Sequence, residues 1–275
     1  MTWFVVGGAG FIGTNLAAHR KNCTVFDLVD NHDALDLDVL TYWMRGHDVV
    51  VHLAANADIA AGADDPSLDL DGITITRNVC DAARATGVRR IIYTSGSGVY
   101  GAASKAWPNE QNATVPTSAY GASKLASEAI LHAYGELYGI EVVVFRPANV
   151  VGPHQTHGVG FDFMRKLRAD PTRLHILGDG KQSKQYLHVN DLLRAFDLAP
   201  PGVWNVAPRD WLSVDEIAAM ACHALNLYAV PFTYSGGLAW PGDIPEVRLE
   251  TSALRRHGWD ARSSVAAMAQ ALAAL

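Results

Sequence analysis

The sequence is poor in cysteine. Its three cysteines, Cys23, Cys80 and Cys222, are odd in number and widely spaced, and no CxxC pair is present. Disulfide frameworks need paired cysteines and an oxidising compartment. The pattern therefore predicts reduced thiols in a cytoplasmic protein rather than a disulfide scaffold.

Long apolar runs and an excess of basic residues are also missing. No stretch approaches the roughly 18–20 apolar residues that span a bilayer. The start, MTWFVVGG, has no basic segment, which predicts the absence of a signal peptide. The formal net charge of -6 disfavours general nucleic-acid binding. We therefore expect neither a membrane nor a nucleic-acid partner, and an anionic ligand would need local cations and backbone amides.

What is present is the composition of an ordinary globular chain. Its 275 residues are 49% hydrophobic and 18% charged, which allows a substantial core. In the first half, short β-branched runs alternate with amphipathic stretches, which predicts βαβ units and a parallel sheet. Strands are expected at 3–6, 24–27, 48–52, 90–94, 142–146 and 204–207, and helices at 11–20, 76–86, 120–138, 213–225 and 263–275. The acidic stretch 64–71 is expected to be a solvated helix start.

Glycines gather where the first expected strand ends. Gly7, Gly10 and Gly13 follow this strand and open the helix that begins at Phe11. Glycine lets the chain turn sharply and lets the backbone approach a pyrophosphate. The free N–H groups of a helix start, here those of Phe11 and Ile12, then bind the anion. This arrangement predicts a dinucleotide-binding, Rossmann-type fold.

An acidic residue at the end of the second expected strand indicates which dinucleotide binds. Asp27 stands 20 residues after Gly7, where a carboxylate accepts hydrogen bonds from a ribose 2′-hydroxyl and repels a 2′-phosphate. The next residue is Leu28 rather than an arginine. We therefore expect NAD, not NADP, as the cofactor.

A tyrosine and a lysine stand four residues apart in SAYGASKLASE. On a helix this spacing places Tyr120 and Lys124 on one face, which also fits a plain surface pair. Tyrosine has a pKa near 10, and a nearby cation lowers such a pKa by about 1–3 units. Lys124, helped by an oxidised nicotinamide, would make Tyr120 a general base for a sugar hydroxyl while hydride leaves the same carbon.

The glycine motif and Tyr120-x-x-x-Lys124 together resemble the extended short-chain dehydrogenase/reductase superfamily. Within it, the sequence is similar to NAD-dependent nucleotide-sugar epimerases and dehydratases over nearly its whole length. We expect an α/β fold with a doubly wound, Rossmann-type parallel sheet and a smaller C-terminal lobe. Residues 1–150 and 186–208 would form the NAD-binding domain, and 151–185 and 209–275 the substrate lobe. The resemblance also implies a homodimer, paired through the helix that carries Tyr120 and its neighbour near 76–86.

Further motifs that resemble those of the family imply which residues contact the cofactor and the substrate. In LDLD the resemblance implies that Asp36 and Leu37 contact the adenine. In VVVHLAANA it implies that the cofactor is lined by Leu53, Ala54, Ala55 and Ala57. In FRPANVVGP it implies that Pro147 lies near the nicotinamide and Asn149 near the substrate phosphate. Two arginines that grip the diphosphate in such enzymes are replaced by Lys184 and Trp240. Because lysine is a point charge and tryptophan is uncharged, the phosphate site is weaker or is rebuilt, with Arg248 as a candidate replacement.

The run YTSGSGVYG, residues 93–101, is where such enzymes carry a catalytic serine or threonine, three residues before the valine. That position is Gly96 in this chain. Ser95 and Ser97 flank it and would point to the opposite side of an extended chain. We expect Ser97 to supply the catalytic hydroxyl, with Ser95 as the second candidate. If neither reaches Tyr120, the tyrosine–lysine pair acts without such a hydroxyl.

These features predict an NAD-dependent epimerase of a nucleotide sugar, acting at C4 of a hexose of the UDP-glucose/galactose type through a transient keto-sugar. Dehydratases of the family carry Asp-Glu where this chain has Ser97 and Gly98, so dehydration is disfavoured. The trimmed lobe and the lost arginine favour one alternative, an NAD-dependent sugar or uronate dehydrogenase. A nucleotide-sugar reductase and a non-enzymatic NAD-binding sensor or scaffold are further alternatives, although a sensor has no need of Tyr120 and Lys124. His154 and His157 lack a third ligand, so no metal site is expected.

Overall fold

The computed structural model describes residues 1–56, 59–239 and 243–275. Its largest sheet has six strands in the order β10-β5-β4-β3-β1-β2, and all neighbours are parallel. The strands are β1 (Trp3–Val6), β2 (Cys23–Phe26), β3 (Val49–His52), β4 (Arg90–Thr94), β5 (Glu141–Pro147) and β10 (Gly202–Val206). The chain proceeds from β1 outward in both directions, which is the doubly wound order. Ligands bind such sheets at the carboxyl edge where the strand order reverses, here between β1 and β3.

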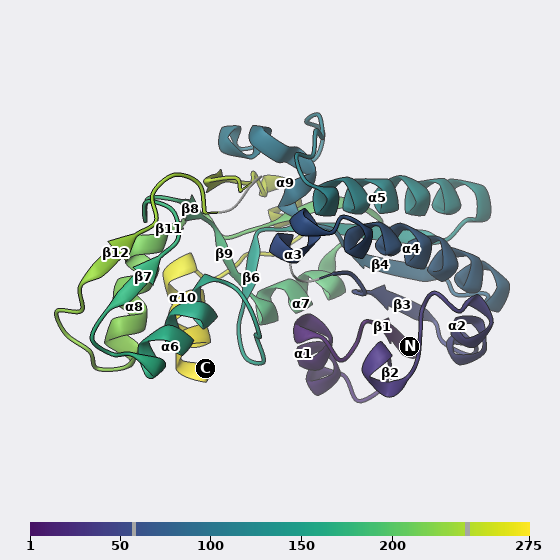
Figure 1. Cartoon of the computed structure of the whole chain (residues 1–275). Helices are drawn as coiled ribbons and strands as arrows, with labels where there is room; N and C mark the ends of the chain where they lie inside the picture. The colour runs from purple at the N-terminus through teal and green to yellow at the C-terminus, as the bar shows by residue number, and fades with distance from the viewer. Residues whose placement is uncertain (57–58, 240–242) are drawn as a thin grey trace.

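Helices cover both faces of this sheet because both faces of its strands are apolar. On one face lie α1 (Phe11–His19) and α7 (Val189–Leu198), packed with β-strand residues such as Val5 and Val51. On the other lie α2 (Leu37–Met44), α4 (Ser67–Thr86) and α5 (Ala119–Tyr138), packed with residues such as Phe4 and Val50. Figure 1 shows α4 and α5 side by side along the sheet.

A smaller lobe, on the left of Figure 1, has a core of its own. Its helices are α6 (Val159–Ala169), α8 (Val214–Ala224) and α10 (Ser264–Ala274), with short strands β6 (Asn149–Val151), β7 (Leu174–Ile176), β8 (Ser183–Lys184), β9 (Tyr186–His188), β11 (Leu212–Ser213), β12 (Phe232–Tyr234) and β13 (Glu246–Val247). Near the short helix α9 (Ser252–Arg255), Leu254 and Trp259 pack in the sheet core instead. The residue boundaries between domain and lobe stay a prediction.

The expected elements agree with the observed ones except around α4. The strands at 3–6 and 90–94 are reproduced residue for residue, and the capping box of Ser213 and Glu216 opens α8. The helix expected from residue 76 begins at Ser67, because its poor helix formers are held by packing against α2 and α5. The acidic stretch 64–71 is not wholly solvated, since Asp69 is only 3% exposed. A short α3 (Ile59–Asp64) precedes α4.

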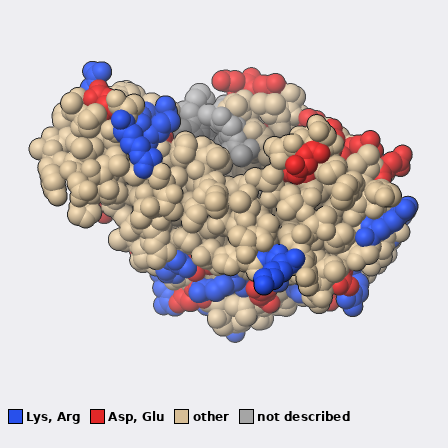
Figure 2. Space-filling model, turned by 90° about the horizontal axis from the view of Figure 1, so that it is seen from below, with Lys and Arg blue, Asp and Glu red and all other residues tan. Residues whose placement is uncertain are grey.

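The surface agrees with the net charge. On the face shown in Figure 2, Asp and Glu gather along the upper right edge, whereas Lys and Arg are mixed with them along the lower edge. Within the described part of the chain, no helix is long and apolar enough to cross a membrane.

Candidate active site

The loop between β1 and α1 has the geometry of an anion-binding turn. Gly7 has a φ of +78°, and a Cβ at this residue would lie 2.5 Å from the backbone nitrogen of Ala54, so only glycine fits. Helix α1 begins at Phe11, and its N-cap residue, Gly10, makes no side-chain cap. The N–H groups of the first turn therefore point outward without an intrahelical partner. This cradle fits the pyrophosphate of a dinucleotide.

Asp27 lies beside this loop, directly after β2. Its Oδ2 accepts a hydrogen bond from the Ala9 nitrogen at 2.9 Å, and its Oδ1 accepts one from the Val29 nitrogen at 3.2 Å. The carboxylate is therefore oriented by the loop and by the 3-10 turn η1 (Leu28–Asp30). It lies at the carboxyl edge of the sheet, where the sequence predicts that it binds the adenosine ribose.

The other predicted cofactor residues follow the same edge. Leu53 and Ala54 come directly after β3 and donate their N–H groups to the Val6 carbonyl, and Pro147 is the buried last residue of β5. The exposed Asp36 is the N-cap of α2, Leu37 is the first residue of that helix, and Ala55 is exposed. Ala57 lies outside the described residues. Their contacts with NAD stay a prediction.

Tyr120 and Lys124 come from the first turns of α5, whose N-cap Ser118 accepts a hydrogen bond from the Gly121 nitrogen at 3.1 Å. Lys124 is 4% exposed, and its Nζ donates to the Thr94 carbonyl at 2.9 Å. The same Nζ lies 5.6 Å from the centre of the Tyr120 ring. The helix therefore places both side chains at the end of β4, beside the carboxyl edge of the sheet.

The pKa values of this pair are set mainly by burial. Loss of solvent raises the pKa of Tyr120 to about 12, and the Asp69 carboxylate adds to the rise. Loss of solvent lowers the pKa of Lys124 to about 8, although Glu128 and Asp69 oppose this. Burial thus opposes the lowered pKa of Tyr120 that the sequence predicts beside Lys124 and an oxidised nicotinamide, and that lowered pKa stays a prediction. The sequence also missed Asp69, which accepts a hydrogen bond from Asn56 Nδ2 at 3.1 Å.

The position of the usual catalytic hydroxyl is empty in this chain. A Cβ at Gly96 would lie 3.6 Å from Tyr120 Oη, so residue 96 does face the tyrosine hydroxyl. Ser95 is 2% exposed and donates from Oγ to Glu128 Oε1 at 2.5 Å. Its prediction as a catalytic hydroxyl is therefore wrong, because the side chain is committed to a buried carboxylate. Ser97, partly exposed at the start of the 3-10 segment η2 (Ser97–Ala106), stays a prediction.

Below Ser95 lies a buried ion pair that the sequence did not predict. Arg146 Nη2 and Glu128 Oε2 are 2.6 Å apart, and both side chains are 7% exposed. Arg146 Nη1 also donates to Tyr100 Oη at 2.8 Å, and Tyr100 Oη donates to Asn205 Oδ1 at 2.9 Å. This network joins α5, β5 and β10 directly beneath the tyrosine–lysine pair.

The cations predicted for the phosphate site have partners within the lobe. Lys184 Nζ donates to Asp243 Oδ1 at 2.8 Å. Arg248 is 6% exposed, donates from Nη2 to Ser183 Oγ at 2.7 Å and stacks 4.3 Å from the centre of the Trp211 ring. The interpretation of Arg248 as a replacement phosphate ligand is therefore wrong. Trp240 lies outside the described residues, and Asn149 is exposed at the start of β6.

Comparisons with known proteins agree with this geometry. The model of the NAD dependent epimerase/dehydratase family matches residues 3–206. A UDP-glucose 4-epimerase of Mycolicibacterium smegmatis is 29% identical over 97% of this chain and 95% of its own length. A crystal structure of UDP-galactose 4-epimerase is 30% identical, covers 100% of this chain and 98% of its own, and has a TM-score of 0.86. The Thermus thermophilus UDP-glucose 4-epimerase in complex with NAD is 25% identical, covers 100% and 98%, and has a TM-score of 0.87.

These matches confirm the predicted doubly wound fold, the resemblance to extended short-chain dehydrogenases/reductases and the choice of cofactor. The glycine cradle and the placement of Asp27 fit that cofactor on the structure's own geometry. The chain belongs to the NAD-dependent epimerase/dehydratase family, and its cofactor is NAD.

Proposed function

We propose that this protein is an epimerase that inverts C4 of the hexose in a nucleotide sugar of the UDP-glucose/galactose type. The observation that carries the proposal is the position of Tyr120 and Lys124 at the end of β4, with Lys124 Nζ held 2.9 Å from the Thr94 carbonyl. In this proposal, Tyr120 is the hydroxyl acid–base group at the carboxyl edge of the sheet, two strands away from the cofactor cradle after β1.

In this reaction Tyr120 transfers the proton and Lys124 stabilises the resulting negative charge. NAD, when bound, supplies the acceptor and the donor for hydride. Tyr120 takes the proton of the C4 hydroxyl as the C4 hydride leaves, and it returns that proton after the keto-sugar has turned over and received hydride on its other face. Lys124, buried beside the tyrosine, stabilises the tyrosinate by its positive charge. No electrons are gained or lost overall, so the product is the epimer.

A second candidate function has structural support. Lys184 is paired with Asp243, and Arg248 is bound to Ser183, so these cations are already neutralised or engaged inside the lobe. A substrate without a diphosphate would not require them. This favours net oxidation of a free sugar or uronate as the alternative, with NADH as a product.

One assay separates the two candidates. Purified protein is incubated with NAD and a panel of UDP- and dTDP-hexoses, UDP-glucuronate and free sugars, with products followed by NMR and NADH by absorbance. We expect the C4 epimer without net NADH. Stoichiometric NADH from a free sugar or uronate would establish the dehydrogenase instead, and no turnover of any compound by NAD-loaded protein would contradict both.

Adding a hydroxyl at position 96 is expected to increase turnover. Gly96 has an extended backbone, with φ near ±180°, and a Cβ there makes only an ordinary contact with Tyr120 Oη, at 3.6 Å. In Gly96→Ser the new Oγ can hydrogen-bond Tyr120 and the reacting hydroxyl, so we expect kcat to rise roughly 3- to 10-fold. Initial rates by NMR measure this. Gly96→Ala is the matched control, and an equal rise in both variants, or no rise in Gly96→Ser, would count against the expected geometry.

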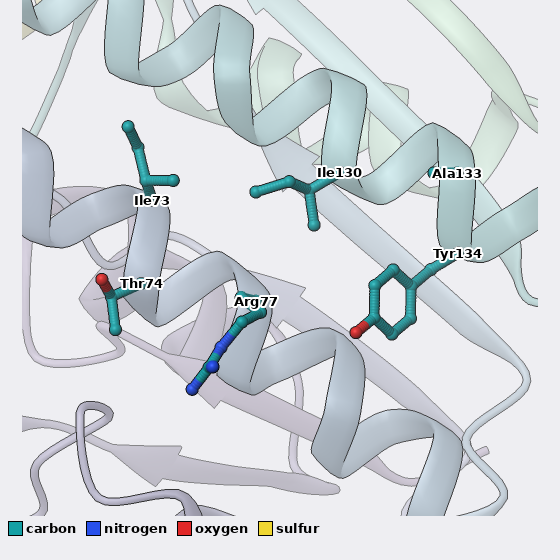
Figure 3. A pocket seen from close by; sticks show the side chains of 6 residues that line it. All are labelled: Ile73, Thr74, Arg77, Ile130, Ala133 and Tyr134. Atoms are coloured by element: carbon teal, nitrogen blue, oxygen red, sulfur yellow. The ribbon is translucent and has the colours of Figure 1, made fainter.

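We also propose that two copies pair through α4 and α5. These helices leave a cavity of about 440 Å³ between them on the outer face of the molecule. Figure 3 shows its lining residues, which are Ile73, Thr74, Arg77, Ile130, Ala133 and Tyr134. If two such faces pack around a two-fold axis, each buries the cavity residues of the other. This favours a second copy of this chain as the partner that covers the cavity.

The mass in solution tests this pairing. We expect light scattering to give a dimer for the unchanged chain and a monomer for Ile130→Asp, because the new carboxylate would be buried without a partner. Leu198→Asp is the matched control, since Leu198 is 46% exposed on α7 at the opposite face of the sheet. A monomeric unchanged chain, or a dimer that persists in Ile130→Asp, would rule the interface out.

We further propose a cytoplasmic location. Its support is the state of the cysteines: Cys23, Cys80 and Cys222 are all free thiols. Fractionation of cells that express the tagged chain measures this directly, and recovery outside the cytoplasm would contradict it.

A further inference from the structure

The hydroxyl of Thr94 is buried and has no hydrogen-bond partner among the described residues. Thr94 is the last residue of β4 and is 7% exposed. Within the described part of the chain, its Oγ1 makes no hydrogen bond. A buried hydroxyl without a partner costs free energy, and native proteins leave few of them. Such a group at the carboxyl edge of a ligand-binding sheet points to a ligand atom that completes its bonding.

The direction of the Thr94 side chain follows from its neighbours in the strand. Tyr93 packs in the core on the α4 and α5 side of the sheet, whereas Ile92 packs on the other side, where Phe11 and Ile12 lie against the same core. Side chains alternate along a strand, so Thr94 is on the side of Ile92, one step nearer the carboxyl edge. Its hydroxyl is therefore on the side of the sheet from which the phosphate-binding helix begins.

The two residues that follow Thr94 offer no comparable hydroxyl. Ser95 is bonded to Glu128, and residue 96 is a glycine. The carbonyl of Thr94 already receives Lys124 Nζ at 2.9 Å, so the same residue touches the acid–base pair through its backbone. In the sheet order, β4 lies two strands from β1, about 10 Å away. A dinucleotide whose pyrophosphate binds after β1 extends its nicotinamide half toward this point.

We propose that Thr94 Oγ1 binds the nicotinamide riboside half of NAD through a hydrogen bond. That half offers both partners a hydroxyl needs, because the carboxamide and the ribose hydroxyls contain donors and acceptors. Thr94 is thus a cofactor-binding residue that the sequence motifs did not assign. It fixes the nicotinamide half from one side of β4, while Tyr120 and Lys124 approach from α5 on the other.

The test compares two ligands on three proteins. After removal of bound nucleotide, the unchanged chain, Thr94→Val and Thr94→Ser are titrated with NAD and with ADP, which lacks the nicotinamide riboside. Valine keeps the shape and removes the hydroxyl, so we expect its Kd for NAD to rise roughly 3- to 10-fold while its Kd for ADP stays unchanged. Thr94→Ser keeps the hydroxyl and should bind NAD like the unchanged chain. An unchanged Kd for NAD in Thr94→Val, or an equal loss for NAD and ADP, would overturn the proposal.

A melting experiment adds a second, independent readout. Without nucleotide, Thr94→Val should melt at the same temperature as the unchanged chain or above it, because no hydrogen bond within the protein is removed. A lower melting temperature would show that the hydroxyl is bonded inside the protein, which also overturns the proposal. Neither measurement needs a sugar, so failure of the proposed epimerase activity and failure of this inference are separate results.

Discussion

Tyr120→Phe is expected to lower the epimerisation rate by about 10²- to 10⁴-fold while the affinity for NAD stays near that of the unchanged chain. Phenylalanine keeps the ring, whose edge lies beside Gly96 and Gly98, and so keeps its packing there. The only group removed is the hydroxyl to which we assign the transfer of the substrate proton. The two positions directly after β4 cannot replace it, because Ser95 is bonded to Glu128 and residue 96 has no side chain.

The measurement is the initial rate of epimer formation by NMR, with the Kd for NAD determined in parallel. Tyr138→Phe is the matched control, since Tyr138 is the last residue of the same helix and is 44% exposed. A Tyr120→Phe protein that retains the full rate would remove Tyr120 from the reaction. Loss of NAD binding together with the rate would instead indicate a structural role for the hydroxyl.

The pH dependence of the same rate carries a defined sign. The pKa of Tyr120 is raised to about 12, so at neutral pH only a small fraction is the base, and the rate should rise with pH. The pKa of Lys124 is lowered to about 8, so above that pH the lysine loses the charge that stabilises the tyrosinate. The residual rate of Tyr120→Phe should lack the rise.

Glu128→Ala is expected to lower the free energy of unfolding by roughly 3–5 kcal/mol. The substitution leaves the Arg146 guanidinium buried without its carboxylate, and it also removes the acceptor of Ser95 Oγ. A buried charge without a partner costs far more than the loss of an exposed ion pair. The network lies beneath Tyr120, so the site would loosen with the fold.

Urea unfolding followed by circular dichroism measures this free energy. Glu136→Ala, an exposed change on the same helix, is the matched control and should alter it by less than about 0.5 kcal/mol. If Glu128→Ala does not fold, Glu128→Gln keeps the shape and a hydrogen-bonding group and should show a smaller loss of the same sign. Equal stability of Glu128→Gln, Glu136→Ala and the unchanged chain would contradict a stabilising role for the pair.

Local physics explains which features the sequence predicted well. The strand at 90–94 and the glycine turn after β1 depend on residues next to each other in the chain: apolar β-branched runs form buried strands, and a φ of +78° at Gly7 requires glycine. The spacing of Tyr120 and Lys124 places them on one helical face wherever the helix lies. The Rossmann-type sheet and the NAD site therefore follow from short segments.

The orientation of side chains at the end of β4 could not be predicted in the same way. Residues 94 to 97 are small and polar, and their order does not predict which of their hydroxyls forms a hydrogen bond with a carboxylate of α5. Ser95 turns to Glu128 because that carboxylate lies 33 residues along the chain but directly beneath the strand. The helix from Ser67 was missed for a related reason, since burial of its residues between α2 and α5 outweighs their poor helix propensity.

The sequence alone therefore determined the α/β class, the glycine turn after β1 and the shared helical face of Tyr120 and Lys124, because each depends on neighbours a few residues apart. Only the tertiary structure decided the surroundings of that pair. It showed that Asp69 is buried close enough to raise the pKa of Tyr120, that Lys184 meets Asp243 across 59 residues and that Thr94 Oγ1 has no partner among the described residues. The physical reason is that the stability of a buried charge or hydroxyl depends on the groups that folding brings within hydrogen-bond distance.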